Sequence, residues 1–280
     1  MNPEYLSLKF TMGDHDSEIW LALLSEWPFE SFHEEENQIT GYILQHDITE
    51  PMARFISEHE GVSFEDYELT KVPDKNWNEV WESSFNPVAI DDFCYIRAEF
   101  HGNIENSFKH VVTIQPKMAF GTGHHATTFM MIQAMSQLDF KEKNVFDFGC
   151  GTGILSVVAA LEGASKVVGV DIQPEAIENS DEHASLNEVS NQCHFYLGGI
   201  EKANTEKYDI ILANINRNVI IENLTELVSL LEQGGYMLIS GIMFDDVKII
   251  SEALGFENMS VLNSRERDQW VQLSTMKSNL

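Results

Sequence analysis

Apolar and polar positions follow their clearest pattern between residues 145 and 171. Residues 145–148 are a short apolar run bounded by charge before and glycine after, which predicts a buried parallel strand. Residues 154–161 carry small and apolar side chains at helical spacing, and residues 167–170 form a second apolar run that ends in Asp171. The order strand, glycine turn, helix, strand and acid predicts one βαβ unit with a ligand site at the carboxyl ends of its strands.

The remainder of the second half continues this alternation of helical and strand patterns, so it predicts an α/β fold with a doubly wound sheet. Residues 208–213 are the fourth strand of this core, and Asn214 follows directly after it. The other expected helices span residues 174–187, 216–231 and 244–254, and the other expected strands span residues 194–197, 235–242, 256–261 and 269–274.

The first seventy residues form a unit of their own. Residues 5–12 alternate apolar and polar positions, which predicts a half-buried strand, and residues 29–33 and 38–45 read as a hairpin. Asp14 or Asp16 can cap one helix and Thr49 a second, and residues 62–72 close the unit with another strand. The order β-α-β-β-α-β is the ferredoxin-like pattern. No chemistry is visible in residues 1–72, so we assign them to substrate recognition.

A linker helix is expected over residues 73–86, where Trp77 and Trp81 share one face. Short strands over residues 88–90, 94–100 and 110–115 then lead into the βαβ unit. The predicted organisation is a recognition domain over residues 1–72, a linker over 73–86 and a catalytic domain over 87–280.

The glycine turn carries the first candidate site. Gly149, Gly151 and Gly153 occur at alternate positions, where the backbone can approach a ligand that a Cβ would obstruct. Asp171 is placed to accept hydrogen bonds from two ribose hydroxyls. A dinucleotide fingerprint requires G-x-G-x-x-G, but Ile154 occupies the place of its third glycine. The D-x-G-x-G-x-G order, with Asp147 first, instead resembles the S-adenosylmethionine loop of seven-strand methyltransferases.

Residues 118–128 form the second candidate stretch. Gly121 and Gly123 precede a polar cluster that opens a helix running to about residue 137. Thr127 and Thr128 fall near the start of this helix, where a hydroxyl can hydrogen-bond a ligand carboxylate or simply cap the helix. Thr127 and Gly151 are therefore candidate cofactor contacts.

Together these motifs identify a family. FGTG followed by histidine and a threonine pair, then DFGCGTG, then ANI at 213–215, resemble the PrmA family of bacterial ribosomal protein methyltransferases. The resemblance covers nearly the whole chain, including the segment NWNEVWESSF. It implies a seven-strand Rossmann-like class I methyltransferase core with an N-terminal ferredoxin-like α+β domain.

The same resemblance implies a cofactor, a substrate and a set of contacts. The cofactor is S-adenosylmethionine, and the substrate is the large-subunit stalk-base protein numbered eleven, methylated on lysine ε-amino and N-terminal α-amino groups. Thr128, Gly149, Asp171 and Asn214 should be the cofactor contacts. This chain departs from the family pattern at the site mouth, where the usual Thr-His-Pro-Thr-Thr is His-His-Ala-Thr-Thr, and where Asn216 and Arg217 follow Ile215.

Asn214 is the candidate catalytic residue. A lysine must lose a proton before it can attack, which costs about 4 to 5 kcal/mol at neutral pH. An amide oxygen at the end of a strand can accept a hydrogen bond from the amine and aim its lone pair. A carboxylate would instead favour the unreactive ammonium. Asn214 therefore suits an amino substrate, although a residue that only ends the strand is the alternative.

Charge narrows the choice of partners. The formal net charge is −28, and residues 1–100 hold 22 acidic residues against 5 Lys and Arg. Such a surface disfavours direct nucleic-acid binding and favours a basic protein, although solubility alone would also explain it. The three cysteines are scattered and odd in number, which indicates reduced thiols in the cytoplasm. We expect no metal, no membrane segment and a monomer.

Three other functions stay open at this point. A small-molecule N-methyltransferase would leave the acidic N-terminal domain without a purpose. A non-catalytic S-adenosylmethionine-binding module would bind cofactor without turnover. A dehydrogenase would be stabilised by NAD against heat, which is simple to measure.

Overall fold

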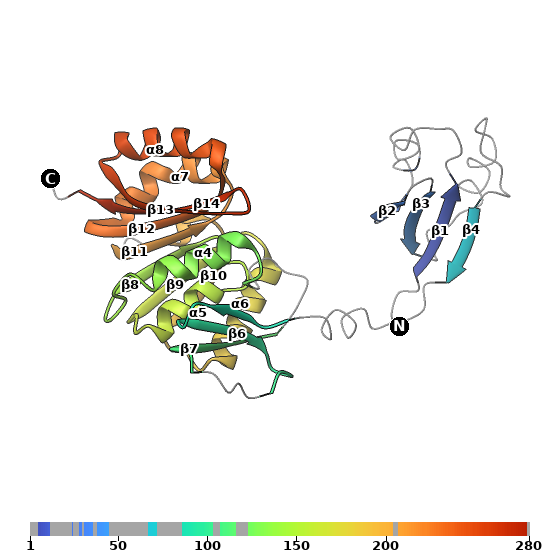
Figure 1. Cartoon of the computed structure of the whole chain (residues 1–280), viewed down its shortest axis with the longest axis horizontal. Coiled ribbons are helices and arrows are strands. Elements are labelled where there is room, and N and C mark those ends of the chain that lie inside the picture. Colours follow the sequence, from blue (N-terminus) through green and yellow to red (C-terminus); the bar gives the residue numbers. More distant parts are fainter. Residues whose placement is uncertain are drawn as a thin grey trace. The chain divides into compact units, whose positions relative to one another are not determined.

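The computed structural model describes residues 5–11, 24, 28–29, 31–35, 38–44, 67–71, 86–102, 107–115, 123–203 and 207–278. The chain divides into two compact units, residues 1–80 and 81–280 (Figure 1). Apart from the helical residue Leu24, the two helices expected in the first seventy residues lie outside the described residues. The linker helix with Trp77 and Trp81, and the FGTG loop up to residue 122, also lie outside them.

The first unit contains a four-stranded antiparallel sheet in the order β2-β3-β1-β4. This is the strand order that a ferredoxin-like β-α-β-β-α-β chain produces. Leu6, Leu8 and Phe10 of β1 are buried, as the alternation in the sequence predicted. The strands are β1 (Tyr5–Thr11), β2 (Ser31–Glu35), β3 (Gln38–Leu44) and β4 (Tyr67–Lys71).

The second unit is built on a seven-stranded sheet in the order β10-β9-β8-β11-β12-β14-β13. The first five strands in this order are parallel, and β14 is inserted antiparallel to both β12 and β13. The strands are β8 (Asn144–Phe148), β9 (Lys166–Asp171), β10 (Cys193–Leu197), β11 (Tyr208–Asn214), β12 (Leu231–Met243), β13 (Met259–Arg267) and β14 (Trp270–Lys277).

The doubly wound α/β sheet predicted from the sequence is confirmed, with shifts of several boundaries; β12, for example, begins at Leu231 and not at residue 235. Asn214 is the last residue of β11 and does not follow it. The closing antiparallel pair is also longer than predicted. The helices are α4 (Ala126–Met135), α5 (Ile154–Leu161), α6 (Pro174–Leu186), α7 (Arg217–Leu230) and α8 (Val247–Phe256), with short 3-10 turns η3 (Ile200–Lys202) and η4 (Phe244–Asp246).

Alternate residues of each core strand enter two separate hydrophobic clusters, one on each face of the sheet. Val145 and Leu212 belong to the cluster beneath α4 and α5, whereas Phe146 and Ile211 belong to the cluster beneath α7 and α8. In Figure 1 the two helix layers lie on opposite faces of the sheet. Because both faces are covered, the core strands read as nearly continuous apolar runs.

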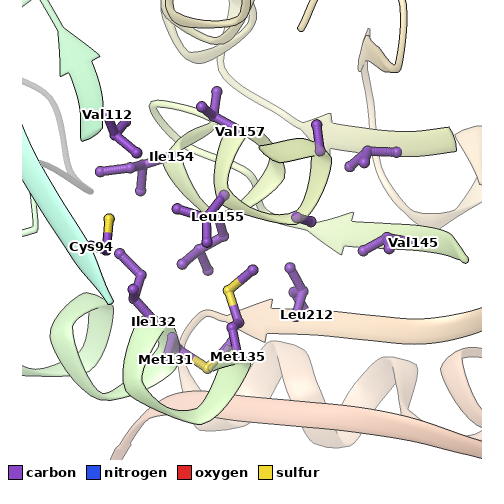
Figure 2. Packing of buried hydrophobic residues seen from close by; sticks show 14 of the residues in the cluster. Cys94, Val112, Met131, Ile132, Met135, Val145, Ile154, Leu155, Val157 and Leu212 are labelled. Atoms are coloured by element: carbon purple, nitrogen blue, oxygen red, sulfur yellow. The ribbon is translucent and has the colours of Figure 1, made fainter. Parts of the chain in front are cut away.

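A small sheet covers α4 and α5 on the side away from the large sheet. It consists of β5 (Val88–Ile90), β6 (Cys94–Ala98) and β7 (His110–Ile114), in that order. Figure 2 shows Cys94 and Val112 of this sheet beside Ile154 of α5 and Ile132 of α4. The helices are therefore enclosed between two sheets, which fixes the loops at their amino ends. Among the described residues, no helix combines the length and apolar character that crossing a membrane requires.

The connections place a crevice in the middle of the large sheet. From β8 the chain winds outward through β9 and β10, then returns to β11 on the other side of β8. The carboxyl ends of β8 and β11 are thus a topological switch point, where open α/β sheets bind ligands.

Candidate active site

The glycine loop after β8 is held by its own backbone. The N–H groups of Gly149 and Cys150 both donate to the carbonyl of Val170 at 2.9 Å. Gly149, Gly151 and Gly153 all have positive φ, and a Cβ on Gly149 would collide with the side chain of Ile215. Only glycine permits both this backbone conformation and this close approach.

Asp171 ends β9 with its carboxylate beside the loop. Its Oδ2 accepts the Gly151 N–H at 3.0 Å, and its Oδ1 accepts the Gln173 N–H at 3.0 Å. These bonds orient the carboxylate, and its remaining lone pairs face a cavity.

The cavity has a volume of about 790 Å³ and lies at the carboxyl ends of the central strands. Five of the six predicted cofactor contacts line it, and they come from β8–α5, β9, α4 and β11. Asp171 and Glu175 are the two carboxylates of the described lining, which contains no Lys or Arg. The five predicted residues are Thr127, Gly149, Gly151, Asp171 and Asn214.

Thr128, the sixth predicted contact, is placed behind the cavity wall. It is fully buried, and its Oγ1 accepts a hydrogen bond from Nδ2 of Asn214 at 3.3 Å. The Oδ1 atom of Asn214 is also shielded from solvent but has no hydrogen-bond partner among the described residues. A buried acceptor without a partner costs free energy, and none of the described residues supplies a donor to this oxygen.

His125 forms the end of α4 nearest the cavity. It is the N-cap of the helix, since its Nδ1 accepts the Thr127 N–H at 3.3 Å. The Thr127 hydroxyl also lies 2.8 Å from this Nδ1, and the ring of His125 packs edge-on against Trp270. The helix is therefore capped by the histidine and not by a threonine hydroxyl.

Asp147 lies beneath the glycine loop and does not line the cavity. It is 1% exposed, Ser156 Oγ donates to its Oδ2 at 2.6 Å, and its Oδ1 has no partner in the described part of the chain. Burial raises the pKa of Asp147 to about 7, the Ser156 hydrogen bonds oppose this rise, and the charge of Asp171 adds to it. In the sequence Asp147 is only the first residue of the D-x-G-x-G-x-G motif, and its burial becomes visible only in the folded structure.

Sequence reasoning missed two lining positions that belong to distant elements. Trp270 comes from β14, and Gly241 from β12. A Cβ on Gly241, whose φ is 79°, would collide with the backbone of Ile215, so this glycine lets the turn after β11 approach β12. Asn216 lines the cavity and caps α7 through its side chain. Trp270 and Gly241 have no local sequence signal that distinguishes them from ordinary turn or strand residues, whereas Asn216 is one of the departures from the family pattern at the site mouth.

These features fit a sulfonium nucleoside. The glycine cradle admits backbone approach, the Asp171 carboxylate can accept ribose hydroxyls, and a lining that bears acids suits a cation better than a pyrophosphate. Among the described residues, no three His, Cys, Asp or Glu side chains are grouped in a way that could hold a metal ion.

Comparison with known proteins agrees with this geometry. The model of the family described as "Ribosomal protein L11 methyltransferase (PrmA)" matches residues 14–278. Proteins named ribosomal protein L11 methyltransferase from Porphyromonas gingivalis and Phocaeicola vulgatus are each 34% identical, over 96% of this chain and 97% of their own. A crystal structure of ribosomal protein L11 methylase from Lactobacillus delbrueckii subsp. bulgaricus shares the fold, with a TM-score of 0.65 and 23% identity over 70% of this chain and all of that one.

Proposed function

Because the chain belongs to the ribosomal protein L11 methyltransferase (PrmA) family and uses S-adenosylmethionine, we propose that it methylates lysine ε-amino and N-terminal α-amino groups of a large-subunit ribosomal protein. The relatives' names point to the protein L11 as this substrate. The proposed preference for an amine has to be explained by the residues of this chain's own site.

The observation that carries the proposal is the Oδ1 of Asn214, which has no hydrogen-bond partner in the described part of the chain. This residue ends β11 at the edge of the cavity, and Thr128 holds its Nδ2, which leaves the carbonyl oxygen as the free acceptor. An incoming amine has N–H groups to donate to it. The amide is neutral, so it accepts this hydrogen bond without stabilising the charged ammonium as a carboxylate would.

The other residues divide the remaining work. Gly149 and Gly151 line the cavity with backbone and no side chain, and Asp171 offers acceptor atoms for two hydroxyls. Bound S-adenosylmethionine supplies an electrophilic methyl group on a positively charged sulfur. Asn214 then has to hold the amine with its lone pair in line with that methyl, since proximity and orientation lower the barrier most in such a displacement.

A lysine that arrives charged must lose a proton before it can attack the methyl carbon. Deprotonation costs about 4 to 5 kcal/mol at pH 7, so the rate should rise with pH as the substrate amine is titrated. The apparent pKa of the reaction should therefore follow the substrate, being lower for an N-terminal α-amine than for a lysine.

We assign substrate recognition to residues 1–72 and catalysis to residues 87–280. Residues 1–100 hold 22 acidic residues against 5 basic ones, which would attract a basic ribosomal protein and repel nucleic acid. Deleting residues 1–72 should abolish protein methylation and preserve cofactor binding. We also propose a monomer that works in the cytoplasm, where the three buried free cysteines would stay reduced.

The test is methylation of ribosomal proteins with methyl-labelled S-adenosylmethionine, followed by mass spectrometry of each labelled peptide. Label on lysine and N-terminal amines of one large-subunit protein supports the proposal. Lys→Arg substitution and N-terminal acetylation of the substrate serve as matched controls, because each removes one class of amine. Label confined to small molecules, or cofactor binding without turnover in any ribosomal fraction, would refute it.

A further inference from the structure

Helix α6 presents one row of side chains to the glycine loop. Ala176 and Asn179 line the cavity, and the next residue of the row, Ser180, donates its hydroxyl to the Gly151 carbonyl at 2.9 Å. The row continues one turn later at His183, which is 1% exposed. The same helix follows Asp171, so it supports the loop from one side along its whole first three turns.

His183 joins the glycine loop to the small sheet. Its Nδ1 lies 2.7 Å from the Thr152 carbonyl oxygen, and its Nε2 lies 3.0 Å from the Gln115 backbone nitrogen. A carbonyl can only accept and an N–H can only donate, so Nδ1 carries the proton and Nε2 is the acceptor. The Gln115 carbonyl, 3.3 Å from Nε2, is then not a partner. Both bonds require the same neutral tautomer.

Asn187, one turn further along, binds the same edge of the small sheet but not the loop. Its Oδ1 accepts the Thr113 N–H at 2.8 Å, and its Nδ2 donates to the Thr113 carbonyl at 2.7 Å. Thr113 lies in β7 and Gln115 directly follows it, and the other edge of β7 pairs with β6. The end of α6 thus takes the place of a neighbouring strand, and His183 joins this edge to the glycine loop.

We propose that His183 is a positioning residue for cofactor binding, which holds the Thr152 peptide of the glycine loop against the end of β7. The loop contains three glycines with positive φ, and such a backbone loses more conformational entropy on ordering than other sequences do. A buried bond at Thr152 orders the loop before any ligand arrives, so less ordering remains to be done on binding. The connection spans 68 positions of the chain between Gln115 and His183.

Two near-isosteric substitutions separate the two bonds. His183→Gln keeps an acceptor near Nε2 for Gln115 but loses the donor to Thr152. His183→Asn keeps a donor near Nδ1 for Thr152 but loses the acceptor to Gln115. We expect the Kd for S-adenosylmethionine, measured by calorimetry, to rise about tenfold in His183→Gln and about twofold in His183→Asn. The kcat of His183→Gln should return to the wild-type value at saturating cofactor.

Asn187→Ala is the matched control, because it removes two bonds to the same strand and one to the His183 backbone carbonyl, but none to the loop. It should lower the melting temperature and leave the Kd for S-adenosylmethionine unchanged within about twofold. The proposal is overturned if His183→Gln binds cofactor as the wild type does, or if Asn187→Ala weakens binding as much as His183→Gln.

A measurement on the unaltered protein decides the matter if His183→Gln does not fold. Coupling between two sites is reciprocal, so cofactor bound at the glycine loop should slow hydrogen exchange of the Gln115 amide. The Thr113 amide, which binds Asn187, is the internal reference and should change less. Equal exchange at Gln115 with and without saturating S-adenosylmethionine would refute the proposal.

Discussion

The two halves of the cavity satisfy their polar groups in opposite ways. In the cofactor half, formed by the glycine loop and Asp171, the N–H groups of Gly149 and Gly151 each have a partner within 3.0 Å. In the amine half, formed by Asn214 and Thr128, one long bond of 3.3 Å fixes the amide and its Oδ1 has no partner among the described residues. The polar groups of the first half are already paired, whereas the second half contains the acceptor that we propose for the substrate amine.

This difference predicts separate effects on binding and on turnover. Changes in the cofactor half should alter the Kd for S-adenosylmethionine, because its groups are already arranged around the space that the cofactor takes. Changes in the amine half should alter kcat, because we propose that its acceptor orients the second substrate. The following substitutions test that separation.

Asn214→Ala should have the largest effect. It removes the acceptor that orients the amine, so kcat should fall about 10²- to 10³-fold, as for loss of a preorganised polar group at other reaction centres. The Kd for S-adenosylmethionine should change by less than about twofold. Single-turnover kinetics and calorimetry measure the two quantities separately.

Thr128→Val is the matched control for Asn214, because it keeps the shape of the side chain and removes only the hydroxyl. A hydroxyl that merely holds the Asn214 amide should cost kcat about tenfold and leave cofactor affinity unchanged. A rise in Kd for S-adenosylmethionine in either variant would instead place these residues in the cofactor half.

Asp171→Ala should have the next largest effect, in the other half. It removes the acceptors for two ribose hydroxyls, and hydrogen bonds to a charged group are strong, so the Kd for S-adenosylmethionine should rise about 100-fold. The kcat at saturating cofactor should fall much less. Asp171→Asn, which retains one neutral acceptor, should show a smaller rise. Unchanged affinity in calorimetry would remove Asp171 from the proposed site.

The same contrast explains what the sequence predicted and what it did not. The cofactor half is encoded within residues 145–171, where strand pattern, glycine spacing and terminal acid are neighbours, so its fold and its residues could be predicted. The amine half combines Thr128 and Asn214, which are 86 positions apart, with Trp270 of β14. Only the order of strands brings them together, and local pattern does not determine a contact of that kind.

Thr128 and His183 show two further limits of sequence reasoning. The family resemblance made Thr128 a cofactor contact, but a side chain's position on a helix does not reveal which neighbour its hydroxyl faces, and here it faces Asn214. His183 lies in a stretch that the sequence marks only as an amphipathic helix. Its role depends on the position of β7, which the sequence pattern of α6 does not predict.

Asp147→Asn tests whether the carboxyl buried beneath the glycine loop titrates in the folded protein. The pKa of Asp147 is raised to about 7, so the folded state binds more protons than the unfolded state between about pH 4 and pH 7. Stability is therefore lost as the pH rises through this window. An asparagine does not titrate, so the difference in unfolding free energy between wild type and variant should change by about 2 kcal/mol from pH 5 to pH 7.

Urea denaturation at several pH values measures this difference in unfolding free energy. Its change with pH is informative whatever the absolute stability of the variant. Ser156→Ala is a useful companion, because it removes the one side-chain donor to the Asp147 carboxyl and should steepen the pH dependence. Parallel stability curves for wild type and Asp147→Asn would show that this carboxyl is not titrated in the window.

Arg217→Ala should have the smallest effect, because Arg217 does not line the cavity and only follows the lining residue Asn216. Arg217 Nη1 lies 2.7 Å from Asp246 Oδ1, and Asp246 Oδ2 accepts the Met243 N–H at 3.0 Å, so the pair braces the turns that follow β11 and β12. The arginine is 43% exposed, and such ion pairs contribute at most about 1 kcal/mol. The KM for the protein substrate should rise about two- to threefold, and the Kd for S-adenosylmethionine should not change.

Charge reversal sharpens this last expectation. Arg217→Asp alone should raise the KM for the protein substrate further than Arg217→Ala does. Combining Arg217→Asp with Asp246→Arg should bring the KM most of the way back to the wild-type value, because the ion pair is restored with its signs exchanged. The effect should shrink at high salt, where exposed pairs are screened. If Arg217→Ala or Arg217→Asp instead raises the Kd for S-adenosylmethionine, the turns after β11 and β12 support the glycine loop as well. Ile215, which packs against Gly149, would transmit this support, and substitutions in one half would then affect both binding and turnover.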